Sequence, residues 1–194
     1  MRFRLCGIRV EISYLLLCLA AMSVILGIFQ SFCCCVLAVI IHESGHLITM
    51  RALGYFPERI KILLFEISIS DPSRQERSAR ENMLIIFFGP AANFICVLPL
   101  FLVYLCGTEK ILPFAAVNLS VGLFNLLPVM SLDGGQLLYL FLTRFLSSEQ
   151  AERTVDFLTF VFIFPLAALG FFVLLKSKNN FSLLFVSVYL IVSL

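Results

Sequence analysis

Tryptophan is absent from this chain, histidine occurs only twice, and charged residues fill only 13% of its 194 positions. Hydrophobic residues fill 61% of them, and the mean hydropathy is +1.04. A soluble globular domain carries roughly 25% charged residues, so this composition excludes that class and indicates an integral membrane protein. The net charge of +2 and the lack of a basic stripe argue against a nucleic-acid partner.

Paired cysteines of the CxxC type are missing as well. The seven cysteines lie mostly in apolar runs, and we interpret them as small buried hydrophobic residues, not as redox or metal-binding groups. No internal repeat or low-complexity tract divides the chain. At this length we predict one transmembrane domain over residues 1–194, without a soluble regulatory domain.

Long polar stretches are scarce, because apolar windows occupy most of the chain. Windows of about 17–25 apolar residues can cross a bilayer. The predicted fold class is therefore all-α: a polytopic membrane protein with about six transmembrane helices. These windows are residues 10–29, 32–50, 83–106, 111–127, 154–175 and 181–194, of which the last is short for a span. We expect the first helix to stay uncleaved, because no A-x-A site follows it.

Basic residues are rare on one side of this topology. With a cytoplasmic N-terminus, only Lys110, Lys176 and Lys178 fall on the far side. The cytoplasmic side then holds the other basic residues, which are Arg2, Arg4, Arg9, Arg51, Arg59, Lys61, Arg74, Arg77, Arg80, Arg144 and Arg153. This distribution obeys the positive-inside rule and supports six crossings.

A small membrane-associated β element is predicted after the second helix. Residues 60–70 end in an alternation of apolar and polar residues, which is the period of a strand, and Asp71-Pro72 ends it. Such a strand offers an edge to which an extended substrate can add. An amphipathic connector at the membrane interface is the alternative.

Both histidines lie in one run, His42-Glu43-Ser44-Gly45-His46, which fits the HExxH signature of zinc proteases. Spaced four residues apart, they lie on one face of a helix and can hold one ion. The flanking residues 36–41 and 47–50 are almost wholly apolar. A soluble metalloprotease needs a polar face on this helix, so the motif indicates an active site inside a membrane.

Of the twelve acidic residues, Glu43 lies well inside an apolar window and Asp133 lies in the interrupted apolar stretch that follows residue 127, and a charge at that depth indicates a function. A catalytic zinc takes three protein ligands and leaves one position open. His42 and His46 supply two, and Asp133 is the leading candidate for the third. The alternative for Asp133 is a helix N-cap.

The context of Asp133 favours a built site. Residues 125–135, Asn-Leu-Leu-Pro-Val-Met-Ser-Leu-Asp-Gly-Gly, interrupt an apolar run, and irregular backbone at membrane depth requires surrounding protein or a water-filled cavity. We expect Gly134 and Gly135 to allow close approach to the helix of the histidines. Asn125 either assists catalysis or packs helices together, whereas Asn93 and Asn118 are interpreted as packing residues.

HExxH in an apolar helix, followed by Asn-x-x-Pro-x-x-x-Leu-Asp-Gly, resembles the site-2 protease family of intramembrane zinc metalloproteases. Gly89-Pro90-Ala-Ala-Asn93 is similar to the third-helix motif of that family. The resemblance covers about residues 36–140, within a protease core of about 32–145, and is strongest to the short bacterial stage IV sporulation branch. It implies one Zn²⁺ per chain on His42, His46 and Asp133, with Glu43 as catalytic acid/base and Asn125 assisting substrate or oxyanion binding.

The resemblance also implies a membrane-tethered substrate, such as a sigma-factor precursor or an anti-sigma factor, and membrane regulatory partners in a bacterial cytoplasmic membrane. Three features of relatives are missing: a nucleotide-binding domain, an inserted PDZ domain, and a glycine pair where this chain has Leu64-Phe65-Glu66-Ile67. Two alternatives stay open, a catalytically silent metal-binding scaffold and a metal or proton transporter. A transporter spreads its polar residues along a path, whereas here they gather at one point.

Overall fold

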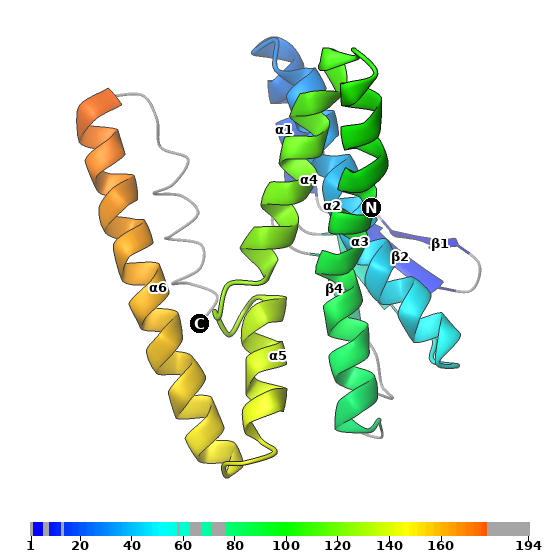
Figure 1. Cartoon of the computed structure of the whole chain (residues 1–194). Coiled ribbons are helices and arrows are strands. Elements are labelled where there is room, and N and C mark those ends of the chain that lie inside the picture. The colour runs from blue at the N-terminus through cyan, green and yellow to red at the C-terminus, as the bar shows by residue number, and fades with distance from the viewer. Residues whose placement is uncertain are drawn as a thin grey trace. The chain divides into compact units, whose positions relative to one another are not determined.

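The computed structural model describes residues 2–5, 8–12, 14–57, 59–62, 67–70 and 77–177, most of them in helices (Figure 1). The chain forms two compact units, Met1–Gly122 and Leu123–Leu194. The final predicted window, residues 181–194, lies outside the described residues, so the count of six spans stays a prediction.

A four-stranded sheet belongs to the first unit. Its order is β1-β2-β3-β4, and its strands are β1 (Arg2–Leu5), β2 (Ile8–Ile12), β3 (Arg59–Ile62) and β4 (Ile67–Ser70). The β1–β2 and β3–β4 pairs are antiparallel, whereas β2 and β3 are parallel, with Arg9 opposite Arg59 and Ile12 opposite Ile62. β4 lies within the segment whose alternation predicted a strand.

The N-terminal strands correct two predictions. The fold is mostly helical and not all-α, and the first helix starts later than the apolar window, because Val10 belongs to β2 and α1 covers Tyr14–Ile25. The segment Arg9-Val10-Glu11-Ile12 alternates polar and apolar residues, which is the period of a strand. Averaging hydropathy over a long window conceals that alternation.

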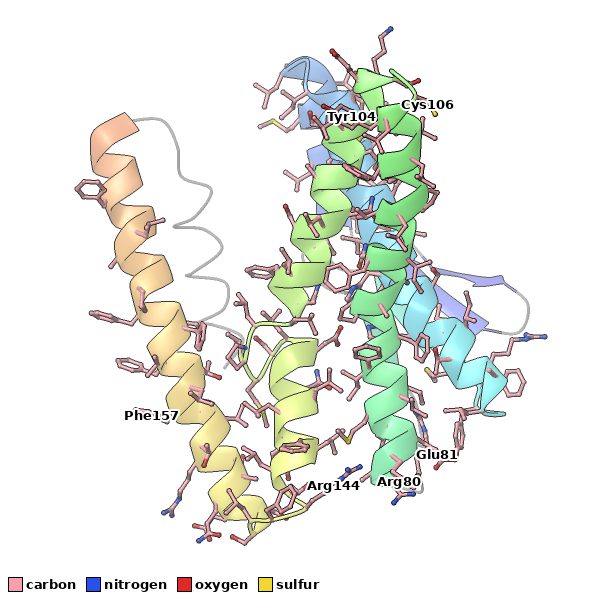
Figure 2. All side chains as sticks on the ribbon, in the orientation of Figure 1. Arg80, Glu81, Tyr104, Cys106, Arg144 and Phe157 are labelled. Carbon is pink, nitrogen blue, oxygen red and sulfur yellow. The ribbon has the colours of Figure 1, made fainter. Side chains whose placement is uncertain are left out.

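Two long helices follow in the first unit, α2 (Phe29–Ala52) and α3 (Ala79–Leu105), and both are long and apolar enough to cross a membrane. They agree with the second and third predicted windows. Gly27, at φ 71°, adopts the left-handed conformation that ends α1 and lets α2 begin two residues later. Figure 2 shows Arg80 and Glu81 at one end of α3 and Tyr104 and Cys106 at the other.

Polar contacts fix the junction between α2 and α3. Ser78 and Glu81 form a capping box that satisfies the first N–H groups of α3. The Tyr55 hydroxyl donates to Glu81 at 3.3 Å, and the Arg77 guanidinium stacks over the Tyr55 ring at 4.6 Å. Burial lowers the pKa of Arg77, while Tyr55 and Glu81 act in the opposite direction.

The remaining helices are α4 (Leu112–Asn125), which follows the short 3₁₀ turn η2 (Glu109–Ile111), then α5 (Asp133–Leu142) and α6 (Ser148–Ser177). In the second unit, Val129, Leu132 and Ile163 form a buried apolar cluster. This cluster packs the irregular segment between α4 and α5 against α6 and therefore positions the start of α5, where Asp133 lies.

Candidate metal centre

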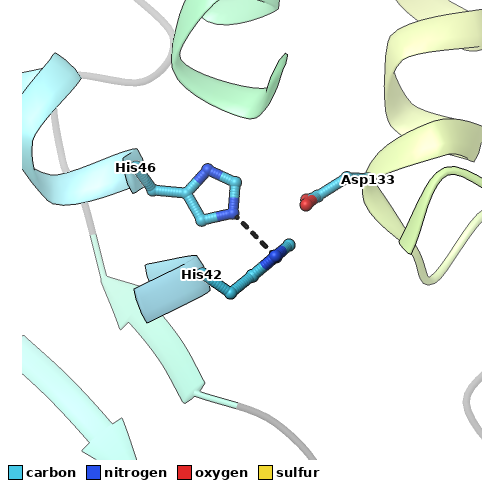
Figure 3. Close-up of side chains that lie close together, drawn as sticks. All are labelled: His42, His46 and Asp133. Atoms are coloured by element: carbon cyan, nitrogen blue, oxygen red, sulfur yellow. Dashed lines mark hydrogen bonds between the residues drawn. The ribbon is translucent and has the colours of Figure 1, made fainter. Parts of the chain in front are cut away.

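The two histidines converge as the HExxH spacing predicted. His42 and His46 lie one turn apart on α2, and their side chains are only 4% and 9% exposed. Their Nε2 atoms approach to 3.3 Å (Figure 3). Two imidazoles on one apolar helix, buried and with facing nitrogens, supply two of the ligands that a metal site needs.

Hydrogen bonds from outside α2 decide which nitrogen of each ring carries hydrogen. His46 Nδ1 lies 2.8 Å from the Ile85 carbonyl, which can only accept, so His46 Nδ1 donates. His42 Nδ1 lies 2.9 Å from Asn93 Oδ1. The Asn93 amide donates to the Ala38 carbonyl at 2.9 Å and to Asn118 Oδ1 at 3.1 Å, so its Oδ1 is an acceptor and His42 Nδ1 also donates.

The tautomers that follow suit a cation. A neutral imidazole with hydrogen on Nδ1 carries its lone pair on Nε2, so the two lone pairs of this site face each other. Two nitrogens bound to one tetrahedral zinc at the usual Zn–N distance lie about 3.3 Å apart, which matches the separation of the Nε2 atoms here. The spacing of the two histidine donors therefore fits zinc.

Two glycines let α3 approach the histidines. A Cβ on Gly89 would overlap the His46 imidazole, and a Cβ on Gly45 would overlap the Phe88 carbonyl. Both positions therefore require glycine for the observed contact between α2 and α3. Pro90 follows at once, removes a helical N–H and favours a bend in α3 at this turn.

Asp133 is the first residue of α5 and is half-buried. The N-cap is Leu132, which makes no side-chain capping bond, so the structure does not support the N-cap alternative for Asp133. At Gly134 and Gly135, the atoms nearest to an added Cβ belong to the preceding segment, chiefly the Leu126 and Val129 carbonyls, so both glycines allow that segment to approach closely. Their expected approach to the helix of the histidines stays a prediction.

The ligand atoms of His42, His46 and Asp133 all lie within 4.8 Å of one another (Figure 3). Among the described residues, this is the group of three that could hold a metal ion. Glu43, next to His42 on α2, and Asn125, the last residue of α4, are both half-buried. Their roles stay predictions.

Asn93 and Asn118 contribute more than the sequence indicated. Both are fully buried, and Asn93 bonds directly to a predicted metal ligand. The sequence signal was Gly89-Pro90-Ala-Ala-Asn93, which places the glycine beside His46 and the asparagine beside His42 one turn apart on α3. Interpreting Asn93 only as packing missed this contact.

Comparison with known proteins finds similarity to metalloproteases over parts of the chain. The model of Peptidase family M50 matches residues 107–169. Stage IV sporulation protein FB of Bacillus subtilis is 26% identical over 75% of this chain and 52% of that protein. A zinc metalloprotease of Methanocaldococcus jannaschii is 25% identical over 73% of this chain and 45% of that protein. The chain thus spans about half the length of these relatives.

The fold has a counterpart among solved structures. The site-2 protease from Methanocaldococcus jannaschii aligns with a TM-score of 0.69 at 22% identity, over 98% of this chain and 91% of that chain. The chain is thus similar to Peptidase family M50 over residues 107–169 and to a stage IV sporulation protein, and it shares its fold with a site-2 protease, in agreement with the resemblance that its motifs indicated.

Proposed function

We propose that this protein is an intramembrane zinc metallopeptidase that hydrolyses a peptide bond in a membrane-associated protein. The observation that carries the proposal is the pair of Nε2 lone pairs facing each other at 3.3 Å, with both Nδ1 atoms already bonded elsewhere. In the proposal Asp133 is the third ligand. Its membership in the group of ligand atoms within 4.8 Å supports that role.

The chain's own residues divide the chemistry. When bound, a zinc ion supplies a Lewis acid that polarises the scissile carbonyl and acidifies water. In the proposal, the carboxylate of Glu43, which directly follows His42 on α2, would take a proton from water and pass it to the leaving amine. Asn125 would donate to the oxyanion that develops on the carbonyl oxygen.

The proposed substrate is a membrane-tethered regulator, such as a sigma-factor precursor or an anti-sigma factor. The similarity to a stage IV sporulation protein supports this class. The basic residues beside the first, second and third apolar windows support a multi-pass protein in a bacterial cytoplasmic membrane with its N-terminus in the cytoplasm. We further propose that membrane proteins regulate it.

The two alternatives make different demands. A transporter needs polar groups along a path, but the fully buried polar side chains of the described α2, α3 and α4 helices gather around His42. A catalytically silent scaffold has no need of the acid in HExxH, and Glu43 is present. Both points favour hydrolysis.

The test is Glu43→Gln in purified, zinc-loaded protein and in cells that co-express a membrane-bound precursor. The carboxamide cannot accept the water proton, so cleavage should fall by about 10²- to 10⁴-fold while zinc content is unchanged. Ser44→Ala is the control, because the Ser44 hydroxyl donates to the Ile41 carbonyl of its own helix, and this variant should cleave normally. Normal cleavage by Glu43→Gln at full zinc content would remove the proposed acid/base.

A further inference from the structure

We propose that Asn93 is a positioning residue that holds His42 in the tautomer able to bind metal through Nε2. The part of this inference that concerns metal affinity rests on the proposed function. The part that concerns the tautomer does not, because it follows from hydrogen bonds within the unit Met1–Gly122.

The direction of every hydrogen bond in this network is fixed at its ends by backbone carbonyls. Asn118 Nδ2 donates to the Phe114 carbonyl at 2.9 Å, one turn earlier in α4. The amide oxygen of Asn118 is thereby turned towards Asn93 and accepts its Nδ2 at 3.1 Å. The Ala38 carbonyl of α2 accepts the same amide group at 2.9 Å. Carbonyls cannot donate, so no alternative orientation of the amides keeps all four bonds.

What remains of Asn93 after these bonds is one acceptor, Oδ1, and it faces His42 Nδ1 at 2.9 Å. Asn93 and Asn118 are both 0% exposed, so water does not compete for the groups. An asparagine that served only to join helices would have no reason to be turned this way. The Ala38 carbonyl and Asn118 Oδ1 instead accept from the amide nitrogen of Asn93 and so turn its oxygen towards His42 Nδ1.

The consequence for His42 is specific. Without an acceptor at Nδ1, the imidazole is free to carry its hydrogen on Nε2, which is the atom facing His46. In that tautomer Nε2 has no lone pair for a metal. Groups that orient a histidine ligand in this way typically contribute about 10- to 100-fold in metal affinity.

Gly122 allows α4 to come close enough for the network. A Cβ there would lie 3.3 Å from the Asn93 Cβ and 3.0 Å from the Phe94 ring. Gly122 lies one turn beyond Asn118 on the same helix, so the asparagine pair and the glycine share the face of α4 that packs on α3.

The chain offers an unusually clean test, because it contains only two histidines. Protein labelled with ¹⁵N-histidine has four ring nitrogens to assign, and long-range ¹⁵N–¹H spectra identify which of them carries hydrogen. Three variants are compared with the wild type, each metal-free and zinc-loaded. Asn93→Leu removes the acceptor at similar volume, Asn93→Asp retains an oxygen acceptor, and Asn118→Leu removes a buried amide that does not bond to His42.

We expect wild-type His42 to carry hydrogen on Nδ1 even without metal. Asn93→Leu should show a mixture of tautomers at His42, an unchanged His46, and zinc affinity lower by about 10- to 100-fold in chelator competition. Asn93→Asp should restore the wild-type tautomer. Asn118→Leu should keep the Nδ1 hydrogen and change zinc affinity by only a few-fold, because the Ala38 carbonyl still accepts from the Asn93 amide and keeps Oδ1 turned towards His42.

Two outcomes would overturn the assignment. One is a folded Asn93→Leu protein whose His42 stays in the Nδ1–H form with unchanged zinc affinity. The other is an equal loss in Asn118→Leu, which would mean helix packing alone. If Asn93→Leu does not fold, Asn93→Ala removes the same acceptor with a smaller side chain. A wild type without zinc binding or cleavage would end the proposed function, yet the metal-free spectra would still decide the tautomer.

Discussion

At the scale of single residues, the candidate metal centre depends on glycines as much as on the histidines themselves. His46 is held from one side by the Ile85 carbonyl, and its ring occupies the space that a side chain at position 89 would need. Glycine at this position therefore serves the ligand directly. Gly45, next to His46 on α2, instead allows the close contact between the backbones of α2 and α3.

Gly89→Ala should displace the His46 ring and lower zinc affinity, because the added methyl overlaps the imidazole. We expect a loss of about 1–3 kcal/mol in the free energy of unfolding, as is typical when a packed site is overfilled. Gly54→Ala is the control, since a methyl there meets nothing within 4 Å and touches no histidine, while the positive φ of Gly54 makes any side chain destabilising. Chelator competition and thermal unfolding measure both effects, and equal zinc affinities in the two variants would contradict the assignment.

Asp133→Ala should lower the zinc content of purified protein and eliminate cleavage, as should His42→Ala and His46→Ala. Two imidazoles alone leave a zinc ion short of the three protein ligands of a catalytic site. Metal analysis of the purified variants measures the loss. Full zinc content and full rate in Asp133→Ala would require another third ligand, and the chain has no third histidine.

The sequence predicted the grouping of His42, His46 and Asp133 better than the contacts around it. In a strongly apolar chain, the few polar residues stand out, so this grouping could be predicted from spacing and depth. The contact of Asn93 with His42 could not, because a buried asparagine between helices has the same sequence signal whether it bonds a histidine or another helix. The close contacts of Gly134 and Gly135 with Leu126 and Val129 could not be predicted either, since a glycine indicates close approach without naming the neighbour.

At the scale of elements, the segment between α4 and α5 relies on one side chain of α6. The Thr159 hydroxyl accepts from the Met130 N–H at 3.0 Å and donates to the Pro128 carbonyl at 3.4 Å, and Thr159 is fully buried. An irregular segment has few backbone partners of its own. Thr159 supplies two of them just before Asp133 begins α5.

Thr159→Val should destabilise the protein by about 1–3 kcal/mol, because it leaves the Met130 N–H without its acceptor at nearly the same volume. Zinc affinity should fall with it, since the segment leads into Asp133. Thr154→Val is the control on the same helix, because the Thr154 hydroxyl donates to the Gln150 carbonyl one turn earlier in α6. Denaturant unfolding in detergent should separate the two, and equal midpoints would speak against the bridge.

Strand β4 carries the prediction of substrate addition. Its residues pair with β3 in antiparallel register, Ile67 with Ile62 and Ser70 with Arg59, and it is an edge of the sheet among the described strands. Backbone N–H groups along such a strand face the partner and the open edge alternately. Proline substituted in turn at each residue of Ile67–Ser70 should therefore reduce cleavage at alternate positions, while zinc is retained. Normal cleavage at every position would reject strand addition.

At the scale of the whole molecule, the described helices expose large apolar side chains and bury polar ones, which is the opposite of the pattern in a soluble protein. Ile48 is 68% exposed and Leu98 is 67% exposed, whereas the polar Asn93 and Asn118 are fully buried. Exposing Ile48 and Leu98 to water would be unfavourable, whereas exposing them to hydrocarbon is not. Hydrocarbon also requires that buried polar groups form hydrogen bonds within the protein. Exposure therefore supports the membrane class that composition indicated.

The orientation of α3 in the membrane follows from its length and its flanks. Its 27 residues extend about 40 Å, which exceeds the hydrocarbon core of about 30 Å. Arg51, Arg77 and Arg80 lie at or near the junction before it, whereas Lys110 lies beyond its far end. The positive-inside rule therefore predicts a cytoplasmic turn at Gly54 and a turn on the opposite side at Gly107.

Alkaline phosphatase fused after Gly107 should therefore be active in a bacterial host, because the enzyme is active only when exported. The same fusion after Gly54 should be inactive, and the two positions are matched because both are glycines at positive φ in turns that end a long helix. Converting Arg77 and Arg80 to glutamine should weaken this difference, since those charges hold the start of α3 on the cytoplasmic side. An active fusion at Gly54 with an inactive one at Gly107 would reverse the topology and place the predicted cytoplasmic N-terminus on the wrong side.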